Sequence, residues 1–213
     1  MSSLKLDSVL MADLIKYRES LDFRPHLWIA QRADQLAKYC KKCKLSALVV
    51  SVSGGVDSAV ILALSVYTMK HYPDIIKKVV PISQPIHSSD WALGRAKEQC
   101  EALGLELKVV DQTKIYDQLR GLIESTLEIT GEDYASGQLR SYMRTPTAYY
   151  VAQLLTQTGT PAIVMGTGNR DEDEYLAYFC KAGDGVVDVS TIYDLHKSQV
   201  FQVGKELGVV DSI

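Results

Sequence analysis

The segment Ser51-Val52-Ser53-Gly54-Gly55-Val56-Asp57-Ser58 joins two apolar runs of different lengths. The run before it, residues 47–50, is short and wholly apolar, which is typical of a buried parallel strand. The run after it, residues 59–66, is almost entirely apolar and long enough for a helix of the core. The segment is therefore predicted to be the turn between a buried strand and a buried helix.

The composition of this turn indicates that it binds an anion. Its two adjacent glycines let a ligand approach the backbone closely, and the free N–H groups that open the helix attract negative charge. Ser53 and Ser58 add hydroxyl donors, and Asp57 adds a carboxylate suited to a magnesium ion carried on phosphates. The turn has neither the lysine-bearing phosphate loop nor the dinucleotide fingerprint. A glycine-rich turn that binds nothing is the alternative interpretation.

The overall composition bounds the class of protein. The chain has 213 residues, of which 46% are hydrophobic and 23% charged, as in a soluble globular domain. A net charge of -3 gives no electrostatic case for a nucleic-acid partner. No apolar run approaches the ~20 residues of a membrane span, and residues 1–5 do not resemble the start of a secretion signal. The expectation is a single domain over residues 1–213, located in the cytoplasm, without nucleic-acid or membrane partners.

Strands and helices alternate along most of the chain. Strands are predicted at 47–50, 78–82, 107–111 and 162–165, and helices at 56–70, 90–103, 115–128, 139–157 and 197–207. Residues 131–137 are polar and are predicted to form a loop. The alternation predicts an α/β fold with a doubly wound parallel sheet flanked by helices. Two further helices, within residues 1–45, precede the first strand and either cap the sheet or form a dimer contact.

A second polar segment follows the strand at 162–165. Residues 166–188 contain too many carboxylates and glycines for a core element, and on their own they suggest a solvated acidic loop. The glycines at 54–55 and at 166–168 both follow predicted strands. Because ligands of such sheets bind beyond the carboxyl ends of the strands, the two turns are expected to face one cleft.

Both segments resemble known families. The Ser-Gly-Gly-x-Asp-Ser loop resembles that of the ATP pyrophosphatases, and residues 166–188 resemble NAD synthetases. The second resemblance is carried by Gly166-Thr167-Gly168-Asn169, Glu172, Tyr178-Phe179, Lys181 and Gly183-Asp184-Gly185, and continues through Asp188, Leu195, Lys197 and Leu207-Gly208. It covers the chain from about residue 26 to its end, and it implies an adenine nucleotide alpha hydrolase-like fold.

The resemblance also implies a set of site residues. The ATP contacts it implies are Ser51, Val52, Ser53, Gly54, Gly55, Val56, Asp57, Ser58, Thr167 and Lys197. Asp57 and Glu172 match the magnesium ligands, although Asp173 takes the place of Glu172 when the alignment is counted back from Lys181. Lys181 and Asp188 match positions that contact the dinucleotide substrate.

This sequence departs from the family pattern in two places. Tyr142 stands where the family usually has the first of two substrate-contacting arginines, whereas Arg144 fits the second. Arg140, one turn away, is the candidate replacement, so Arg140, Tyr142 and Arg144 are all candidate substrate contacts. The sequence also ends at Ile213, where the family continues with a lid segment carrying another ATP contact. Either this is a fragment or a short member with an open site.

The expected activity is that of an ammonia-dependent NAD synthetase, a ligase that forms a C–N bond. It would amidate deamido-NAD through an acyl adenylate, with ATP as co-substrate and Mg²⁺ as cofactor, and would release AMP and pyrophosphate. The residues outside the core leave no room for a glutaminase domain, so ammonia is expected to arrive free or from another chain. The alternatives are another ATP-pyrophosphatase amidase and an inactive nucleotide-binding paralogue.

A homodimer is also expected, because the resemblance suggests one and apolar side chains gather on two parts of the chain. These side chains are Leu14, Ile15, Trp28 and Ile29 in the first two helices, and Tyr149, Tyr150, Val151, Leu154 and Leu155 in the helix 139–157.

Overall fold

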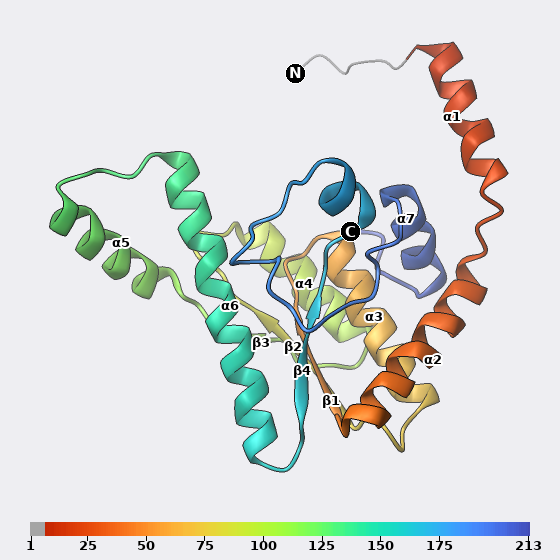
Figure 1. Ribbon diagram of the computed structural model, residues 1–213, viewed down its shortest axis with the longest axis horizontal. Coiled ribbons are helices and arrows are strands. Elements are labelled where there is room, and N and C mark those ends of the chain that lie inside the picture. Colours follow the sequence, from red (N-terminus) through yellow and green to blue (C-terminus); the bar gives the residue numbers. More distant parts are fainter. Residues whose placement is uncertain (1–6) are drawn as a thin grey trace.

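The computed structural model describes residues 7–213, so the prediction made for residues 1–5 lies outside the described residues. Helices and strands alternate along most of the chain, as predicted (Figure 1). The elements are α1 (Ser8–Ser20), α2 (Pro25–Cys43), β1 (Ala47–Ser51), α3 (Val56–His71), β2 (Lys78–Ser83), α4 (Asp90–Ala102), β3 (Lys108–Val109), α5 (Thr113–Leu127), α6 (Asp133–Gln157), β4 (Ala162–Gly166), the π-helical turn η1 (Asp171–Tyr175), β5 (Val189–Ser190) and α7 (Lys197–Glu206).

The five strands form one parallel sheet in the order β3-β2-β1-β4-β5. The central strand β1 pairs with β2 on one side and with β4 on the other, so that Val49 lies between Val80 and Val164. The chain winds outward from β1 to β3, then returns to place β4 on the opposite side of β1. The prediction of a doubly wound parallel sheet is confirmed, and its switch point lies between β1 and β4.

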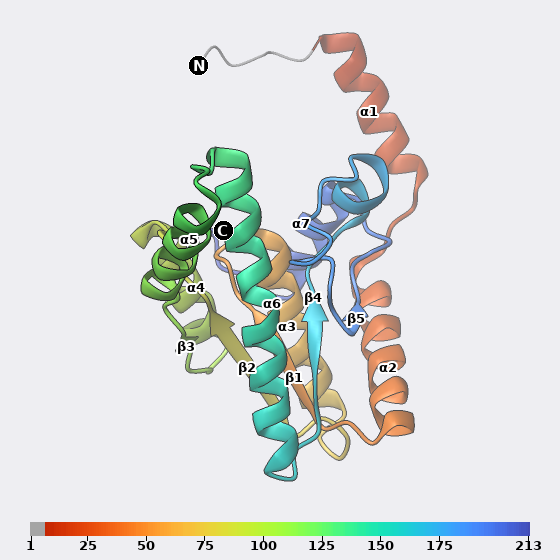
Figure 2. The same ribbon diagram turned by 60° about the vertical axis from the view of Figure 1, so that its left-hand side comes forward.

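Helices cover both faces of this sheet (Figure 2). On one face, Val49, Val80 and Val164 pack with Ala148 and Ala152 of α6. The strand residues of the opposite face, among them Leu48, Val50 and Met165, pack in a larger core that includes α3. Burial on both faces explains why the central strands are continuously apolar instead of alternating.

Helix α3 lies inside the molecule, between the sheet and a pair of outer helices. It contacts β1 and β2 on one side and α2 and α7 on the other. Its residues from Ser58 to Val66 are all buried. An environment of this kind requires a helix that is apolar all round, as the run 59–66 predicted.

The two N-terminal helices, both of which the structure describes, have different surroundings, and neither packs directly on the sheet as the capping interpretation expected. α2 buries Ile29 and Ala33 among other residues, and it packs on α3 and α7. In contrast, α1 projects away from the body of the molecule (Figures 1 and 2), and none of its residues, all of which the structure describes, is buried.

Three local predictions require correction. Residues 131–137 are not a loop throughout, because α6 begins at Asp133 and runs through Pro146 without a break in its assignment. This first turn is tied to α5 by a hydrogen bond of 3.3 Å from the Tyr116 hydroxyl to the Ser136 carbonyl, a tertiary contact that outweighs the weak helix propensity of its polar residues.

The predicted strand 107–111 pairs at Lys108–Val109 alone, because it lies at the edge of the sheet and both residues are exposed. The opposite edge strand β5 and the turn η1 fall in the segment 166–188, whose composition suggests an acidic loop. Each is too short to show a periodic pattern in the sequence. Within residues 7–213, no helix combines the length and apolarity that crossing a membrane requires.

Candidate functional site

The candidate site lies where β1 and β4 end side by side at the same edge of the sheet. The chain leaves β1 through the Ser51–Ser58 turn into α3, and it leaves β4 through residues 167–170 into η1. The two connections diverge at the switch point, which leaves a crevice between them. The two glycine-bearing turns lie on either side of this crevice, so they face one cleft as predicted.

Hydrogen bonds within the first turn fix its shape. The Ser53 N–H donates to Ser58 Oγ at 3.2 Å, and the Gly55 N–H donates to Ser53 Oγ at 3.3 Å. The Ser58 hydroxyl donates to the Gly55 carbonyl at 2.9 Å. Among the described residues, no side chain caps the N-terminus of α3, so the first N–H groups of this helix remain open to an anion.

Gly54 is required for this turn to pack as it does. Its φ of +85° is unfavourable for other residues, and a Cβ atom at this position would lie 2.3 Å from the Ala92 carbonyl oxygen in the first turn of α4. The absence of a side chain thus brings α4 against the turn.

Lys197 connects the two halves of the site. Its Nζ donates to the Asp57 carboxylate in the first turn of α3, and to Glu172 Oε1 in η1 at 2.9 Å. Burial alone would lower the pKa of Lys197, but its bonds to Asp57 and Glu172 outweigh this effect and raise the pKa above its usual value. The side chain therefore places a positive charge between two carboxylates.

The buried Asn169 also holds the same cluster in place through hydrogen bonds. Its Nδ2 donates to Asp57 Oδ1 at 2.9 Å, while its Oδ1 accepts from the N–H groups of Asp171 and Glu172 at 3.0 and 3.1 Å. The side chain has no exposed surface. One amide thus fixes the carboxylate of α3 relative to the backbone that carries Glu172.

Asp171 attaches helix α7 to the same turn. Its two oxygens accept from His196 Nδ1 at 2.7 Å and from the Lys197 N–H at 2.8 Å. Burial alone would raise the pKa of Asp171, but these two hydrogen bonds hold it below its usual value. A carboxylate at a helix N-terminus is also favoured by the helix dipole. Asp171 thereby sets the position from which the Lys197 side chain extends.

The structure distinguishes the two carboxylates between which the alignment left a choice. Glu172 shares the Lys197 ammonium with Asp57, whereas the Asp173 carboxylate packs against Gly168, where a Cβ atom would lie 2.0 Å from Asp173 Oδ2. Burial raises the pKa of Asp173, and the nearby carboxylates of Asp184, Glu172 and Asp57 raise it further. Glu172 is thus better placed than Asp173 to share a cation with Asp57.

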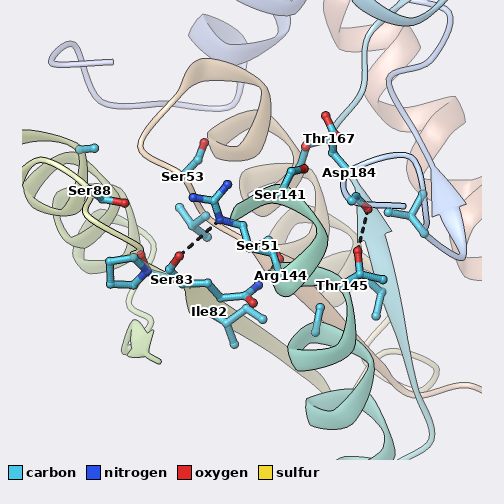
Figure 3. A pocket seen from close by; sticks show the side chains of 18 of the residues that line it. Ser51, Ser53, Ile82, Ser83, Ser88, Ser141, Arg144, Thr145, Thr167 and Asp184 are labelled. Carbon is cyan, nitrogen blue, oxygen red and sulfur yellow. Dashed lines mark hydrogen bonds between the residues drawn. The ribbon is translucent and has the colours of Figure 1, made fainter. Parts of the chain in front are cut away.

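A cavity of about 320 Å³ adjoins this cluster beneath α6 (Figure 3). It is lined by residues from the ends of β1 and β2, from the start of α4, from α6 and from the segment 183–187. Arg144 and Asp184 are the charged residues among those that line it, and the guanidinium of Arg144 points into it. Burial lowers the pKa of Arg144, and the neighbouring charge of Arg140 lowers it further.

The predicted site residues fall into three groups. Ser51, Val52, Ser53, Arg144 and Thr167 line the cavity. Gly54, Gly55, Val56 and Ser58 complete the turn beside it, and Asp57, Glu172 and Lys197 form the charged cluster. Arg140, Tyr142, Lys181 and Asp188 are not among the residues that line the cavity.

These four outlying residues have other surroundings. Arg140 Nε donates to the Ser136 carbonyl of its own helix at 3.4 Å, and Tyr142 and Lys181 are exposed. Asp188 accepts from the Val164 N–H at 2.8 Å and from the Tyr149 hydroxyl at 3.2 Å, so it connects α6 to β4. Their predicted contacts with a substrate stay predictions.

Sequence reasoning missed several residues of the site. Asn169 and Asp184 were noted as parts of motifs without a role, and Asp171 and Gln84 were not singled out. Gln84 lines the cavity, donates to Ser51 Oγ at 3.1 Å and accepts from Gln112 at 2.9 Å. It directly follows β2, so the rule that ligands bind beyond the carboxyl ends of strands would have identified it.

The donor set is compatible with a magnesium ion. Mg²⁺ prefers hard oxygen ligands and is commonly held by one or two carboxylates together with substrate phosphates and water. Asp57 and Glu172 supply two such groups, and the single ammonium bonded to both shows that one cation reaches the two carboxylates at once. Among the described residues, no group of three or more potential His, Cys, Asp or Glu ligands is present.

A family profile and individual sequence relatives agree on the family to which this chain is similar. The sequence profile of the family described as NAD synthase matches residues 28–213. The NH(3)-dependent NAD(+) synthetase of Methanococcoides burtonii is 34% identical over 171 residues, which are 79% of this chain and 60% of the relative. That of Pyrobaculum aerophilum is 33% identical over 178 residues, which are 83% of this chain and 61% of the relative. The chain thus spans about three fifths of the length of these two relatives.

Solved structures agree with the sequence relatives. The structure of NMN synthetase from Francisella tularensis has a TM-score of 0.77 and 29% identity, and the similarity covers 90% of this chain and 74% of that one. The parallel five-stranded sheet flanked by helices is the adenine nucleotide alpha hydrolase-like fold. Because the NAD synthase profile matches most of the sequence, and the fold and the relatives agree with it, the chain belongs to the NAD synthase family.

Proposed function

We propose that this protein carries out the ATP-dependent amidation of deamido-NAD to NAD, with ammonia as the nitrogen donor. The observation that carries the proposal is the cluster of Asp57, Glu172 and Lys197, which unites the nucleotide-type turn after β1 with the acidic turn after β4. The relatives named NH(3)-dependent NAD(+) synthetase support the choice of reaction.

In the proposed first step, the nicotinate carboxylate attacks the α-phosphorus of ATP. The bond between this phosphorus and the bridging oxygen breaks, and pyrophosphate leaves. The open N–H groups of α3 and the hydroxyls of Ser53 and Ser58 are placed to hold its oxygens. Asp57 and Glu172 would hold magnesium, which would supply charge neutralisation for the leaving group.

In the proposed second step, ammonia attacks the carbonyl carbon of the acyl adenylate. AMP leaves with the electron pair of the C–O bond, and the nitrogen loses a proton as the amide forms. No covalent bond to the protein is required, so the contribution of the chain is positioning and charge stabilisation. Arg144 provides a cation inside the cavity for an anionic part of one substrate.

One specific observation favours a second candidate substrate. The structure of NMN synthetase from F. tularensis is similar to 90% of the present chain. An enzyme of that name forms a pyridine mononucleotide amide, so we propose nicotinate mononucleotide as the alternative carboxylate. The replacement of an expected arginine by Tyr142 also places recognition of the second nucleotide half in question.

Pyrophosphate release tests both candidates. The protein with ATP, Mg²⁺ and ammonium should release pyrophosphate when deamido-NAD is added and release none without it. Parallel assays with nicotinate mononucleotide give the ratio of the two kcat/KM values, which decides between the substrates. If neither deamido-NAD nor nicotinate mononucleotide causes pyrophosphate release, the proposed function is contradicted. The remaining candidates are then another amidase and an inactive nucleotide-binding paralogue.

The working unit is proposed to be a homodimer located in the cytoplasm. The dimer is supported by exposed apolar side chains on α5 and α6, among them Leu122, Leu127 and Tyr150. Several residues predicted for the interface are instead packed in the chain's own core. Ile29 is buried, and Trp28, Tyr149, Val151 and Leu155 pack against buried clusters.

A further inference from the structure

The ammonium of Lys197 occupies the position between the two carboxylates that are proposed to hold magnesium. Its Nζ is bonded to Asp57 and lies 2.9 Å from Glu172 Oε1. Asn169 binds the other oxygen of Asp57 and leaves the one that faces Lys197 for a cation. The best place for a metal shared by the two carboxylates is therefore already filled by a positive charge of the protein itself.

A metal and the ammonium cannot both occupy this position. Magnesium binds carboxylate oxygens at about 2.1 Å, so a metal on the oxygens that Lys197 now contacts would lie within a few ångströms of Nζ. Two cations at such a separation repel each other strongly in a partly buried site. The lysine, on a flexible four-carbon chain at the first position of α7, is the partner that is able to move.

We propose that Lys197 is an exchangeable counter-ion, which holds the metal-free site together and moves onto the nucleotide phosphates when magnesium takes its place. The exchange changes the charge available to a ligand. With the ammonium alone, the two carboxylates and Lys197 carry one net negative charge, which repels phosphate. With a divalent metal on the carboxylates and the ammonium beside it, the same groups carry one net positive charge.

The exchange also gives order to binding. While Lys197 is paired with Asp57 and Glu172, two of its three N–H donors are bonded to the carboxylates. The arrival of the metal releases the ammonium and attracts the phosphates at once. We therefore expect the metal and the pyrophosphate group to bind with strong cooperativity. Part of this cooperativity should depend on Lys197.

Two parts of the surrounding structure are suited to this exchange. Asp171 holds the backbone of Lys197 independently of its side chain, with a bond of 2.8 Å to the Lys197 N–H. Asn169 holds Asp57 from the side opposite the ammonium. The Lys197 side chain is thus free to leave while helix α7, the Asp57 carboxylate and the backbone of Glu172 keep their places.

The first test uses Mn²⁺ as a magnesium substitute and needs neither ATP nor a pyridine nucleotide. The inference rests on the metal site of the proposed function, but it is independent of which carboxylate is amidated. Binding of Mn²⁺ to the full chain is measured by electron paramagnetic resonance for the wild type and for Lys197→Met, Lys197→Arg and Lys205→Met. Lys205 lies on the same helix and is exposed, so it is the matched control.

Lys197→Met should bind Mn²⁺ about tenfold or more tightly than the wild type, because it lacks the competing ammonium. In the wild type, a charge-assisted bond has to be broken before the metal binds. Lys197→Arg keeps a competing cation and should not bind more tightly than the wild type, and Lys205→Met should match the wild type. An unchanged affinity in Lys197→Met would overturn the exchange. Failure of Mn²⁺ to bind the wild type or Lys197→Met would overturn the metal site and the exchange with it.

Crystals of the wild-type chain provide a second test that does not depend on how well the variants fold. They are examined without metal and after addition of Mn²⁺, whose anomalous signal locates it. The expected result is a peak shared by Asp57 and Glu172, with Lys197 Nζ beyond hydrogen-bond distance of both. A peak elsewhere, or a lysine still bonded to both carboxylates beside the metal, would disprove the inference without touching the proposed amidation.

Discussion

At the scale of single residues, the site depends on a few polar side chains that are far apart in the sequence. Asp57 and Lys197 are separated by 140 positions, and Asp57 and Asn169 by 112. Their proximity follows from the strand order, which places β4 beside β1 and so brings the turn after β4 to the N-terminus of α3. Spacing in the sequence contains no trace of these contacts. The rule that ligands bind beyond the carboxyl ends of strands brought the two turns to one cleft, and the resemblance to NAD synthetases added Lys197 to the same site.

Replacement of Asp57 by asparagine should remove most of the metal-dependent activity. Asp57→Asn keeps the size of the side chain and an oxygen for Asn169, but it removes the charge proposed to hold magnesium. We expect kcat/KM to fall by about a hundredfold or more, measured as pyrophosphate release. Asp74→Asn, in an exposed loop, is the matched control and should leave activity unchanged. Near-normal activity of a folded Asp57→Asn protein would rule out this role.

Arg144 and Arg140 should differ in their effects. Arg144 points its guanidinium into the cavity, whereas Arg140 bonds to the Ser136 carbonyl of its own helix. Arg144→Ala should raise the KM of one anionic substrate about tenfold or more, because a charge-assisted hydrogen bond in a buried site is lost. Arg140→Ala should have a smaller effect. A larger effect of Arg140→Ala would show that Arg140 replaces the arginine missing at Tyr142.

At the scale of elements, the sequence predicted best where burial dictates composition. The strands β1 and β4 and the helix α3 are enclosed by other elements, so their residues are apolar in unbroken runs that are visible in the sequence. The edge strands β3 and β5 contain two residues each, and hydrogen bonds to a neighbouring strand define them. The start of α6 is polar and exposed, so its helical state depends on contacts with α5 that composition does not reveal.

The attachment of α7 through Asp171 should make the protein sensitive to acid. The pKa of Asp171 in the folded chain lies below its usual value of 3.8, because the Lys197 N–H and His196 outweigh the opposing effect of burial. Its contribution to stability is therefore complete above pH 3.8 and is lost as the pH falls through the lower, folded-state pKa.

Asp171→Asn should consequently reduce the free energy of unfolding at neutral pH and flatten its decline with acid. Urea denaturation followed by circular dichroism between pH 7 and pH 3 measures both effects. The reference is Asp74→Asn, whose side chain is exposed in the turn between α3 and β2. Parallel pH profiles for Asp171→Asn and the wild type would contradict the assigned role.

At the scale of the whole molecule, the distribution of exposed apolar side chains points to contacts with another chain. Helix α5 contacts α6 and projects from one side of the body, opposite α1 (Figure 1). It exposes a row of apolar side chains, namely Ile115, Leu119, Leu122, Ile123 and Leu127. Exposed apolar residues that form a contiguous patch, instead of lying singly, are characteristic of interaction sites.

The proposed homodimer should bury this face of α5. An obligate dimer buries about 2,000 Å² or more in total, and closed two-fold pairing is the commonest soluble assembly. Sedimentation velocity at micromolar and nanomolar concentrations should give the dimer at both. Leu122→Lys places a charge on a side chain that is 65% exposed in the single chain, so it should leave the monomer folded while preventing its association.

The control for this prediction is Phe201→Lys, which adds the same charge at an exposed apolar residue of α7. It should remain dimeric. If the substrate cleft lies partly across the interface, the Leu122→Lys monomer should also lose activity. This loss would occur although Leu122 and Lys197 are far apart in the sequence. A wild-type protein that sediments as a monomer at micromolar concentration and retains full activity would refute the dimer. A dimer that persists in Leu122→Lys would instead place the interface away from α5, because a buried unpaired lysine would be too costly to accommodate there.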